Sequence, residues 1–308
     1  MQQVVILCPL FNDETSFNMF AAAIEKEIQQ LAEYQFSFLI VNDGSLTKPA
    51  IKTSLASTLL HLRRNLGHQK AIAIGLSYLH HHLDFDHVII MDADGEDKPE
   101  DIIRLLQASR EDKIVFGQRA SRQNGKRFKG FYSIYKTLFQ LLTGKKISFG
   151  NFMLLSKTHV AKLVYLSEIW SHMAGAILKS KIPFTTVAAH RGKRYSGQSK
   201  MNFTSLVLHG LGAIGVFIDV IATRLLIFSI IMIGISVLAI LIIIVVRFFT
   251  DAAIPGWATA AFSSMLIVLL QSFLLSLFTI FLYLSSQAQR QFIPANHYED
   301  YLASVEKL

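Results

Sequence analysis

Two long stretches without a charged residue limit what the C-terminal third of this chain can fold into. The first runs from Leu225 to Val246, and the second lies within 254–289, with its span expected at 259–283. As a helix, the first stretch would be about 33 Å long, enough to cross the hydrocarbon core of a bilayer. Buried helices of a soluble domain are a poor explanation at this length. We therefore predict a hairpin of two transmembrane helices.

Charge is distributed unevenly along the chain. Residues 1–112 carry 16 acidic and 9 basic side chains, residues 113–200 carry 17 basic side chains and one acid, and residues 201–308 carry 4 basic and 5 acidic ones. Because the basic zone directly precedes the apolar stretches, it favours anionic lipid or a phosphorylated substrate as partner, and nucleic acid is the disfavoured alternative. The positive-inside rule places both flanks of the hairpin, and both termini, in the cytosol.

A mostly apolar segment, 201–217, lies between the basic zone and the first long stretch. It contains Asn202, His209 and three glycines, which interrupt its apolar character. A third membrane span is one interpretation. We favour an amphipathic helix that lies in the membrane interface and leads the chain into the bilayer.

The N-terminal half alternates short apolar runs with helical patterns. We expect strands at 4–8, 36–41, 59–62, 88–91 and 114–116, and helices at 17–33 (with Ser16 as its cap), 69–81 and 130–143. Strands that alternate with helices form a mainly parallel sheet covered by helices on both faces. The sequence therefore predicts an α/β domain.

Polar clusters follow three of the expected strands. They are Pro9-Leu10-Phe11-Asn12-Asp13-Glu14, Asn42-Asp43-Gly44-Ser45 and Asp92-Ala93-Asp94. Ligands of open α/β sheets bind beyond the carboxyl ends of the strands, where these clusters would meet. Two carboxylates one residue apart suit Mg²⁺ or Mn²⁺, which would neutralise a departing nucleoside diphosphate. Taken singly, each cluster is also compatible with an ordinary surface turn.

Six motifs, in one order along the chain, carry a family resemblance. They are the three clusters above, Arg64-Asn65-Leu66-Gly67, Gly117-Gln118-Arg119 and Arg194-Tyr195-Ser196-Gly197-Gln198-Ser199-Lys200. With them the chain resembles family 2 glycosyltransferases with the GT-A fold. More narrowly, it resembles the polyprenyl-phosphate glycosyltransferases of the dolichol-phosphate-mannose synthase and bactoprenol glucosyltransferase type. Two C-terminal spans are the usual plan of the bactoprenol branch.

The resemblance implies roles for individual residues. For the donor nucleotide it implies Pro9, Phe11, Glu14, Asp43, Asp92 and Ala93. For a Mg²⁺ or Mn²⁺ ion it implies Asp92, Asp94 and Glu96, the last at a position that the family often fills with Gln. As catalytic residues it implies Asp94, Arg119, Arg194 and Lys200, and for the acceptor phosphate Arg119, Arg127, Ser199 and Lys200.

One motif departs from the family pattern. The chain has Gly150-Asn151-Phe152-Met153 where the family commonly has Gly-Asp-Phe-Arg. Asn151 cannot act as a base, and Met153 cannot bind a phosphate. Either this subfamily binds the lipid phosphate with Arg119, Arg127 and Lys200, or the chain has another acceptor or is an inactive paralogue. The intact remaining motifs favour the first interpretation.

The expected organisation has four parts: a cytosolic GT-A catalytic domain at 1–200, an interfacial amphipathic region at 201–222, a transmembrane hairpin at 223–290 and a cytosolic tail at 291–308. The expected function is a metal-dependent, inverting transfer of one sugar from a nucleotide-sugar donor to a polyprenyl phosphate, at the cytosolic face of the cytoplasmic membrane. A different membrane acceptor, and a degenerate nucleotide-sugar-binding scaffold, are the alternatives. The sequence leaves open the donor sugar, its base and the oligomeric state, a homo-oligomer included.

Overall fold

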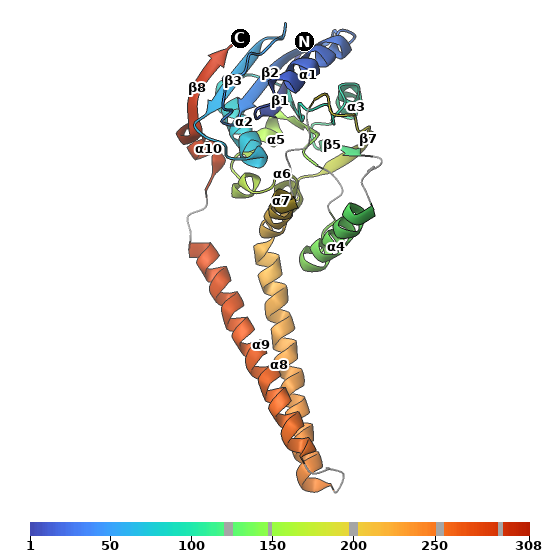
Figure 1. Cartoon of the computed structure of the whole chain (residues 1–308), viewed down its shortest axis with the longest axis vertical. Helices are drawn as coiled ribbons and strands as arrows, with labels where there is room; N and C mark the ends of the chain where they lie inside the picture. Colours follow the sequence, from blue (N-terminus) through green and yellow to red (C-terminus); the bar gives the residue numbers. More distant parts are fainter. Residues whose placement is uncertain (120–125, 147–149, 197–202, 251–255, 289–291) are drawn as a thin grey trace. The chain divides into compact units, whose positions relative to one another are not determined.

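The computed structural model describes residues 1–119, 126–146, 150–196, 203–250, 256–288 and 292–308 (Figure 1). The chain divides into two units. The first comprises Met1–Gln140, Lys145–Val216 and Gln291–Leu308, and the second comprises Leu141–Gly144 and Phe217–Arg290. The first unit therefore contains segments from both sides of the two long apolar stretches.

The described part of the first unit contains one eight-stranded sheet, in the order β7-β5-β6-β4-β1-β2-β3-β8. Four strand pairs are parallel (β1 with β2, β1 with β4, β2 with β3, β5 with β7) and three are antiparallel. The strands are β1 (Gln2–Leu10), β2 (Tyr34–Asn42), β3 (Ser57–Leu62), β4 (His87–Ile90), β5 (Ile114–Arg119), β6 (Met153–Ser156), β7 (Phe184–Ala189) and β8 (Leu302–Lys307). The mainly parallel sheet is thus confirmed.

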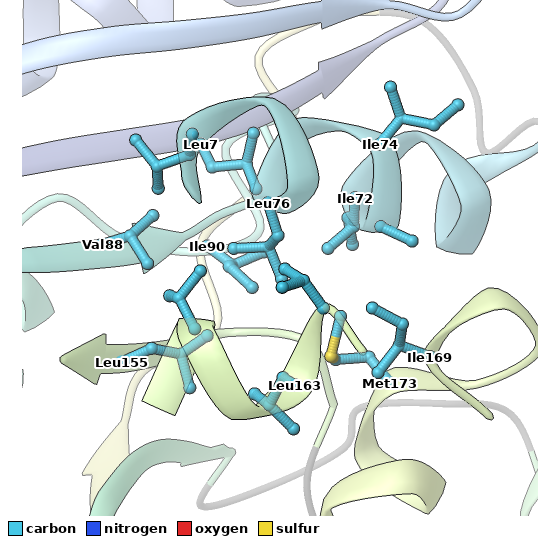
Figure 2. Close-up of a cluster of buried hydrophobic side chains, with 14 of the residues drawn as sticks. Leu7, Ile72, Ile74, Leu76, Val88, Ile90, Leu155, Leu163, Ile169 and Met173 are labelled. Atoms are coloured by element: carbon cyan, nitrogen blue, oxygen red, sulfur yellow. The ribbon is translucent and has the colours of Figure 1, made fainter. Parts of the chain in front are cut away.

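Helices cover both faces of the sheet, as the alternating pattern predicts. Helices α1 (Glu14–Ile28) and α3 (Asp101–Gln107) pack on one face, and α2 (His68–His82), α5 (Lys157–Leu163) and α6 (Met173–Ser180) pack on the other. Successive strand residues point to opposite faces, so β1 places Ile6 in the α1 layer and Leu7 in the α2 layer. Figure 2 shows part of the α2 layer.

Three details of the first unit differ from the sequence-based prediction. Strands β6 and β7 are not among the expected strands. Strand β6 is only four residues long and fully buried, so it shows no alternation of polar and apolar residues. Helix α1 begins at Glu14, and Ser16 is a buried residue inside it rather than its cap. Two further elements complete this part: α4 (Lys126–Thr143) and the 3₁₀ turn η1 (Ser167–Trp170).

The prediction that residues 291–308 form a separate tail is wrong, because these residues belong to the first unit. Helix α10 (Pro294–His297), the 3₁₀ turn η2 (Tyr298–Tyr301) and β8 follow the hairpin, and β8 pairs antiparallel with β3. Without β8, β3 would be an edge strand with unpaired backbone groups. Aromatic contacts fix the segment: the ring centroids of Trp170 and Phe292 are 4.3 Å apart, and those of His81 and Tyr298 are 5.3 Å apart.

The apolar segment before the hairpin forms a single short helix, α7 (Phe203–Gly215). Its 13 residues span about 20 Å, too short to cross a bilayer. The alternative of a third span is therefore wrong. Helix α7 belongs to the first unit and packs against α6, and the rings of His209 and His172 lie 4.6 Å apart. Its place in the membrane interface stays a prediction.

The second unit is a helical hairpin of α8 (Ile218–Phe249) and α9 (Trp257–Ala288). The two helices pack against each other toward the loop that joins them and spread apart toward their other ends (Figure 1). Each is long and apolar enough to cross a membrane, and only 11% of the most apolar window of either helix is buried. Large apolar side chains therefore cover their outer surfaces, which suits lipid as the surrounding medium. In position and character they match the two predicted membrane spans.

Candidate active site

The carboxyl ends of β4, β1 and β2 meet at one edge of the sheet. The Asp43 N–H donates to the Leu10 carbonyl at 2.8 Å, and the Met91 N–H donates to the Leu7 carbonyl at 3.1 Å. These bonds follow from the parallel pairing of β1 with β2 and of β1 with β4. The loops after the three strands are consequently neighbours, at the position where open α/β sheets bind ligands.

Asp43 connects two loops of this edge. Its buried carboxylate accepts the backbone N–H groups of Leu66 (2.7 Å) and Gly67 (2.9 Å). Burial raises the pKa of Asp43, and these two hydrogen bonds act in the opposite direction. Gly44 has a φ of +68°, and a Cβ there would collide with the backbone of Arg64 and Asn65. The structure thus gives Asp43 a role in holding the start of α2 at the site, while its contact with the donor stays a prediction.

The loop after β4 carries the paired aspartates and is held by its own hydrogen bonds. The Asp92 N–H donates to the Asp97 carboxylate at 3.1 Å, and the Glu96 N–H donates to the Asp94 Oδ1 at 2.8 Å. Asp97 is 3% exposed. The sequence analysis did not single out Asp97, although this carboxylate lies only three residues after Asp94 in the same loop. This carboxylate fixes the start of the loop.

Arginines from the segment before the membrane contact the same loop. The Arg194 guanidinium lies 2.6 Å from the Asp94 Oδ2 and 3.6 Å from the Glu96 Oε1. Arg191 donates to both carboxylate oxygens of Glu96 at 2.8 Å. One guanidinium nitrogen, Arg191 Nη2, thus contacts both oxygens of Glu96, a predicted metal ligand. Hydrogen bonds between charged groups are shorter and stronger than those between neutral groups.

Backbone contacts align the segment 190–196 with the Asp92 loop. The Tyr195 N–H donates to the Asp94 carbonyl, and the Gly192 N–H donates to the Glu96 carbonyl, both at 2.9 Å. Gly95 has a φ of +89°, and a Cβ there would collide with the Tyr195 ring. Position 95 therefore requires glycine, because only glycine permits this φ and this close approach of the Tyr195 ring.

His68 is a site residue that the sequence analysis did not single out. It is the first residue of α2, and its Nε2 lies 3.2 Å from the Asp92 Oδ1. Desolvation by the surrounding protein lowers the pKa of His68, and Asp97, Asp94 and Asp43 partly offset this effect. The sequence feature that could have identified His68 as a site residue is its position directly after the Arg64-Asn65-Leu66-Gly67 motif.

The chemistry of this cluster fits a divalent cation. Asp92 and Asp94 supply hard oxygen ligands from one loop, and the imidazole of His68 lies against Asp92. Among the residues that the structure describes, no group of three His, Cys, Asp or Glu side chains is arranged as a ready-made metal cage. A bound ion would therefore take its remaining ligands from water and from the donor diphosphate.

The other predicted site residues are placed as follows. Pro9 is half-buried near the end of β1, Phe11 is 36% exposed in the loop after it, Glu14 begins α1, and Ala93 is buried in the α1 layer. Arg119 ends β5 and Arg127 lies in α4, and both side chains lie outside the described part of the chain, as do Ser199 and Lys200. The roles of these residues stay predictions.

The motif that departs from the family pattern is part of the core. Met153 is fully buried in β6, where it pairs with Ile90 of β4, and Phe152 contacts Gly117 of β5. Asn151 is partly exposed. Position 153 is therefore filled by an apolar side chain that packs in the α2 layer.

A mainly parallel sheet of this order, with paired carboxylates at the carboxyl ends of its strands, is the architecture of the GT-A glycosyltransferase fold. Residues 5–163 match the model of glycosyl transferase family 2, and the chain belongs to this family.

Similar proteins agree with this assignment. An uncharacterized glycosyltransferase of Bacillus subtilis, YkcC, is 25% identical, and the alignment covers 83% of this chain and 81% of the relative. The bactoprenol glucosyl transferase of Shigella phage SfV is 27% identical over 70% of this chain and 73% of its own. The crystal structure of Mycobacterium tuberculosis glucosyl-3-phosphoglycerate synthase covers 71% of this chain and 80% of its own, with a TM-score of 0.50 and 12% identity, which shows the shared fold alone.

Proposed function

We propose that this chain transfers a single sugar from a nucleotide-sugar donor to a polyprenyl phosphate at the cytosolic face of the cytoplasmic membrane, with inversion at the anomeric carbon. The observation that carries the proposal is the contact between Arg194 and Asp94. It brings the loop that precedes the membrane segments to the carboxylates of the donor site. The bactoprenol glucosyl transferase of phage SfV supports a lipid acceptor.

The residue types suit this reaction. A phosphate monoester is already anionic near neutral pH, so it needs positioning and charge compensation more than a base. In our proposal Arg194 supplies these, together with Arg119, Arg127, Ser199 and Lys200. Asp92 and Asp94 would hold Mg²⁺ or Mn²⁺, which supplies a Lewis acid for the departing diphosphate. Direct attack of the phosphate oxygen on the anomeric carbon breaks the bond to the diphosphate and inverts the configuration.

One observation favours a second candidate. The buried Met153 stands where the family commonly places an arginine, so this chain lacks one phosphate-binding group. A transferase that uses another membrane acceptor, or a nucleotide-sugar-binding scaffold, would tolerate this loss. The acceptor assay below separates the three cases.

Membranes that contain the protein should convert undecaprenyl phosphate into a lipid heavier by one sugar. The assay supplies a panel of nucleotide sugars one at a time and analyses the extracted lipids by mass spectrometry. We expect one donor to give the product, and membranes with Asp94→Asn to give none. A glycosylated product on a different lipid would identify another acceptor, and donor binding without any product would favour the scaffold.

The connectivity of the two units supports an even number of membrane crossings. The chain enters the hairpin after α7 and returns to the same catalytic unit, where β8 pairs with β3. Because one folded unit cannot lie on both sides of a bilayer, both ends of the hairpin share one side. The basic zone before the hairpin favours the cytosol as that side.

A cysteine introduced by Thr250→Cys, at the end of α8, should react with a membrane-impermeant maleimide in intact spheroplasts. The background is low because the single native cysteine, Cys8, is fully buried. As a matched control, Leu46→Cys, at a side chain that is 90% exposed in the catalytic unit, should react only after the cells are opened. The reverse pattern of labelling would contradict the proposed orientation.

A further inference from the structure

We propose that His68 is a direct ligand of the divalent cation at the Asp92 loop. The inference deepens the proposed function and rests on its metal site. The family resemblance implies ligands from the Asp92 loop alone. The geometry adds the imidazole on α2, whose Nε2 lies 3.2 Å from the Asp92 Oδ1.

The first argument is the distance between the two ligand atoms. The His68 Nε2 and the Asp92 Oδ1 are 3.2 Å apart. Adjacent ligands of an octahedral ion with bonds of about 2.1 Å are separated by about 3.0 Å. The two side chains therefore have nearly the spacing that a shared ion requires. Only a small movement would be needed for both atoms to bind it.

The second argument concerns the carboxylates of the loop itself. The Arg191 Nη2 lies 2.8 Å from both oxygens of Glu96, and the Arg194 Nη2 lies 2.6 Å from the Asp94 Oδ2. A cation at this loop therefore competes with two arginines for these carboxylates. A ligand from another element, such as the imidazole on α2, would strengthen its binding.

The third argument is that the backbone already holds His68 in place. Asp43 accepts the N–H groups of Leu66 and Gly67, the two residues before it. Gly67 has a φ of +93°, which turns the chain into α2. The following turn of α2 is anchored by buried residues, including Ala71 and Ile72. A ligand fixed in this way loses little conformational entropy when it binds a metal.

An imidazole ligand also changes the expected metal preference. Carboxylate and water ligands suit Mg²⁺ and Mn²⁺, while imidazole nitrogen binds the later transition metals more readily than Mg²⁺. With His68 as ligand, the protein should bind Mn²⁺ more tightly than Mg²⁺. His68→Gln should reduce the Mn²⁺ affinity at least tenfold and should reduce the preference over Mg²⁺.

The decisive experiment is pulsed electron paramagnetic resonance of Mn²⁺ bound to the full-length protein in detergent, without a histidine tag and without donor or acceptor. A directly bound imidazole transfers spin density to its nitrogen and gives a ¹⁴N modulation of the echo. We expect this modulation in the wild type and its loss in His68→Gln. The matched control His80→Gln removes a histidine from the run at the end of α2 and should retain it.

Each outcome bears on the proposal. Bound Mn²⁺ without ¹⁴N modulation in the wild type would overturn it, because His68 would then only hydrogen-bond to Asp92. Modulation that persists in His68→Gln would also overturn it, since another histidine would be the ligand. None of these readouts requires turnover, so a failed acceptor assay leaves the test intact.

Discussion

Replacing Asp94 by asparagine should lower sugar transfer by at least about a thousandfold. The change removes a charge that we assign to the metal and that contacts Arg194 at 2.6 Å. A Lewis acid contributes several kcal/mol to the stabilisation of developing charge, and about 4 kcal/mol corresponds to a thousandfold in rate. Asparagine keeps the size of the side chain and the oxygen that accepts the Glu96 N–H, so the fold should remain. The rate is measured as lipid-linked sugar formed per minute.

Two controls accompany this measurement. Asp84→Asn removes an exposed aspartate in the loop before β4 that forms a surface ion pair with Lys157, and it should leave the rate within about twofold. Treatment of the wild type with an excess of chelator should reproduce the loss, and added Mn²⁺ or Mg²⁺ should reverse it. Full turnover in chelator would show that the carboxylates serve another purpose.

The sequence predicted the architecture well where patterns were long. The expected strand at 4–8 lies inside β1, and the one at 88–91 matches β4 to within one residue. Of the expected membrane spans, 225–246 lies within α8 and 259–283 lies within α9. It failed at β8, because a short edge strand acquires its structure from a neighbour that is more than 200 residues away in the sequence. Tertiary pairing of this kind leaves no local signal.

The candidate site shows the same division. Parallel strand order brought the Asp43 and Asp92 loops together as expected, since it follows from the alternation of strands and helices. The contacts of individual side chains could not be predicted from the sequence. Asp43 binds two backbone N–H groups, Glu96 binds Arg191, and His68 faces Asp92. These contacts depend on loop conformation, which glycines at positive φ determine and which residue spacing does not encode.

Met153→Arg, which restores the residue common in the family, should destabilise the catalytic unit rather than improve acceptor binding. Met153 is fully buried, and the cluster around it in the α2 layer consists of apolar side chains such as those in Figure 2. An unpaired guanidinium in such surroundings costs several kcal/mol, and the larger side chain adds strain. A loss of about 4 kcal/mol is a large part of the stability of a typical domain. Thermal unfolding of the full-length protein in detergent measures it.

The matched variants separate burial from chemistry. Met153→Leu conserves volume and should cost less than about 1.5 kcal/mol, and Asn151→Asp, at a partly exposed position, should change stability little. If Met153→Arg instead unfolds at the wild-type temperature and increases transfer to undecaprenyl phosphate, the arginine must reach the acceptor phosphate from β6. The buried methionine would then be a lost catalytic group, and the native protein would use a different acceptor. If Met153→Arg instead unfolds at a lower temperature than the wild type, position 153 belongs to an apolar core that does not accommodate an arginine. Binding of the acceptor phosphate would then depend on Arg194 and the basic segments around it.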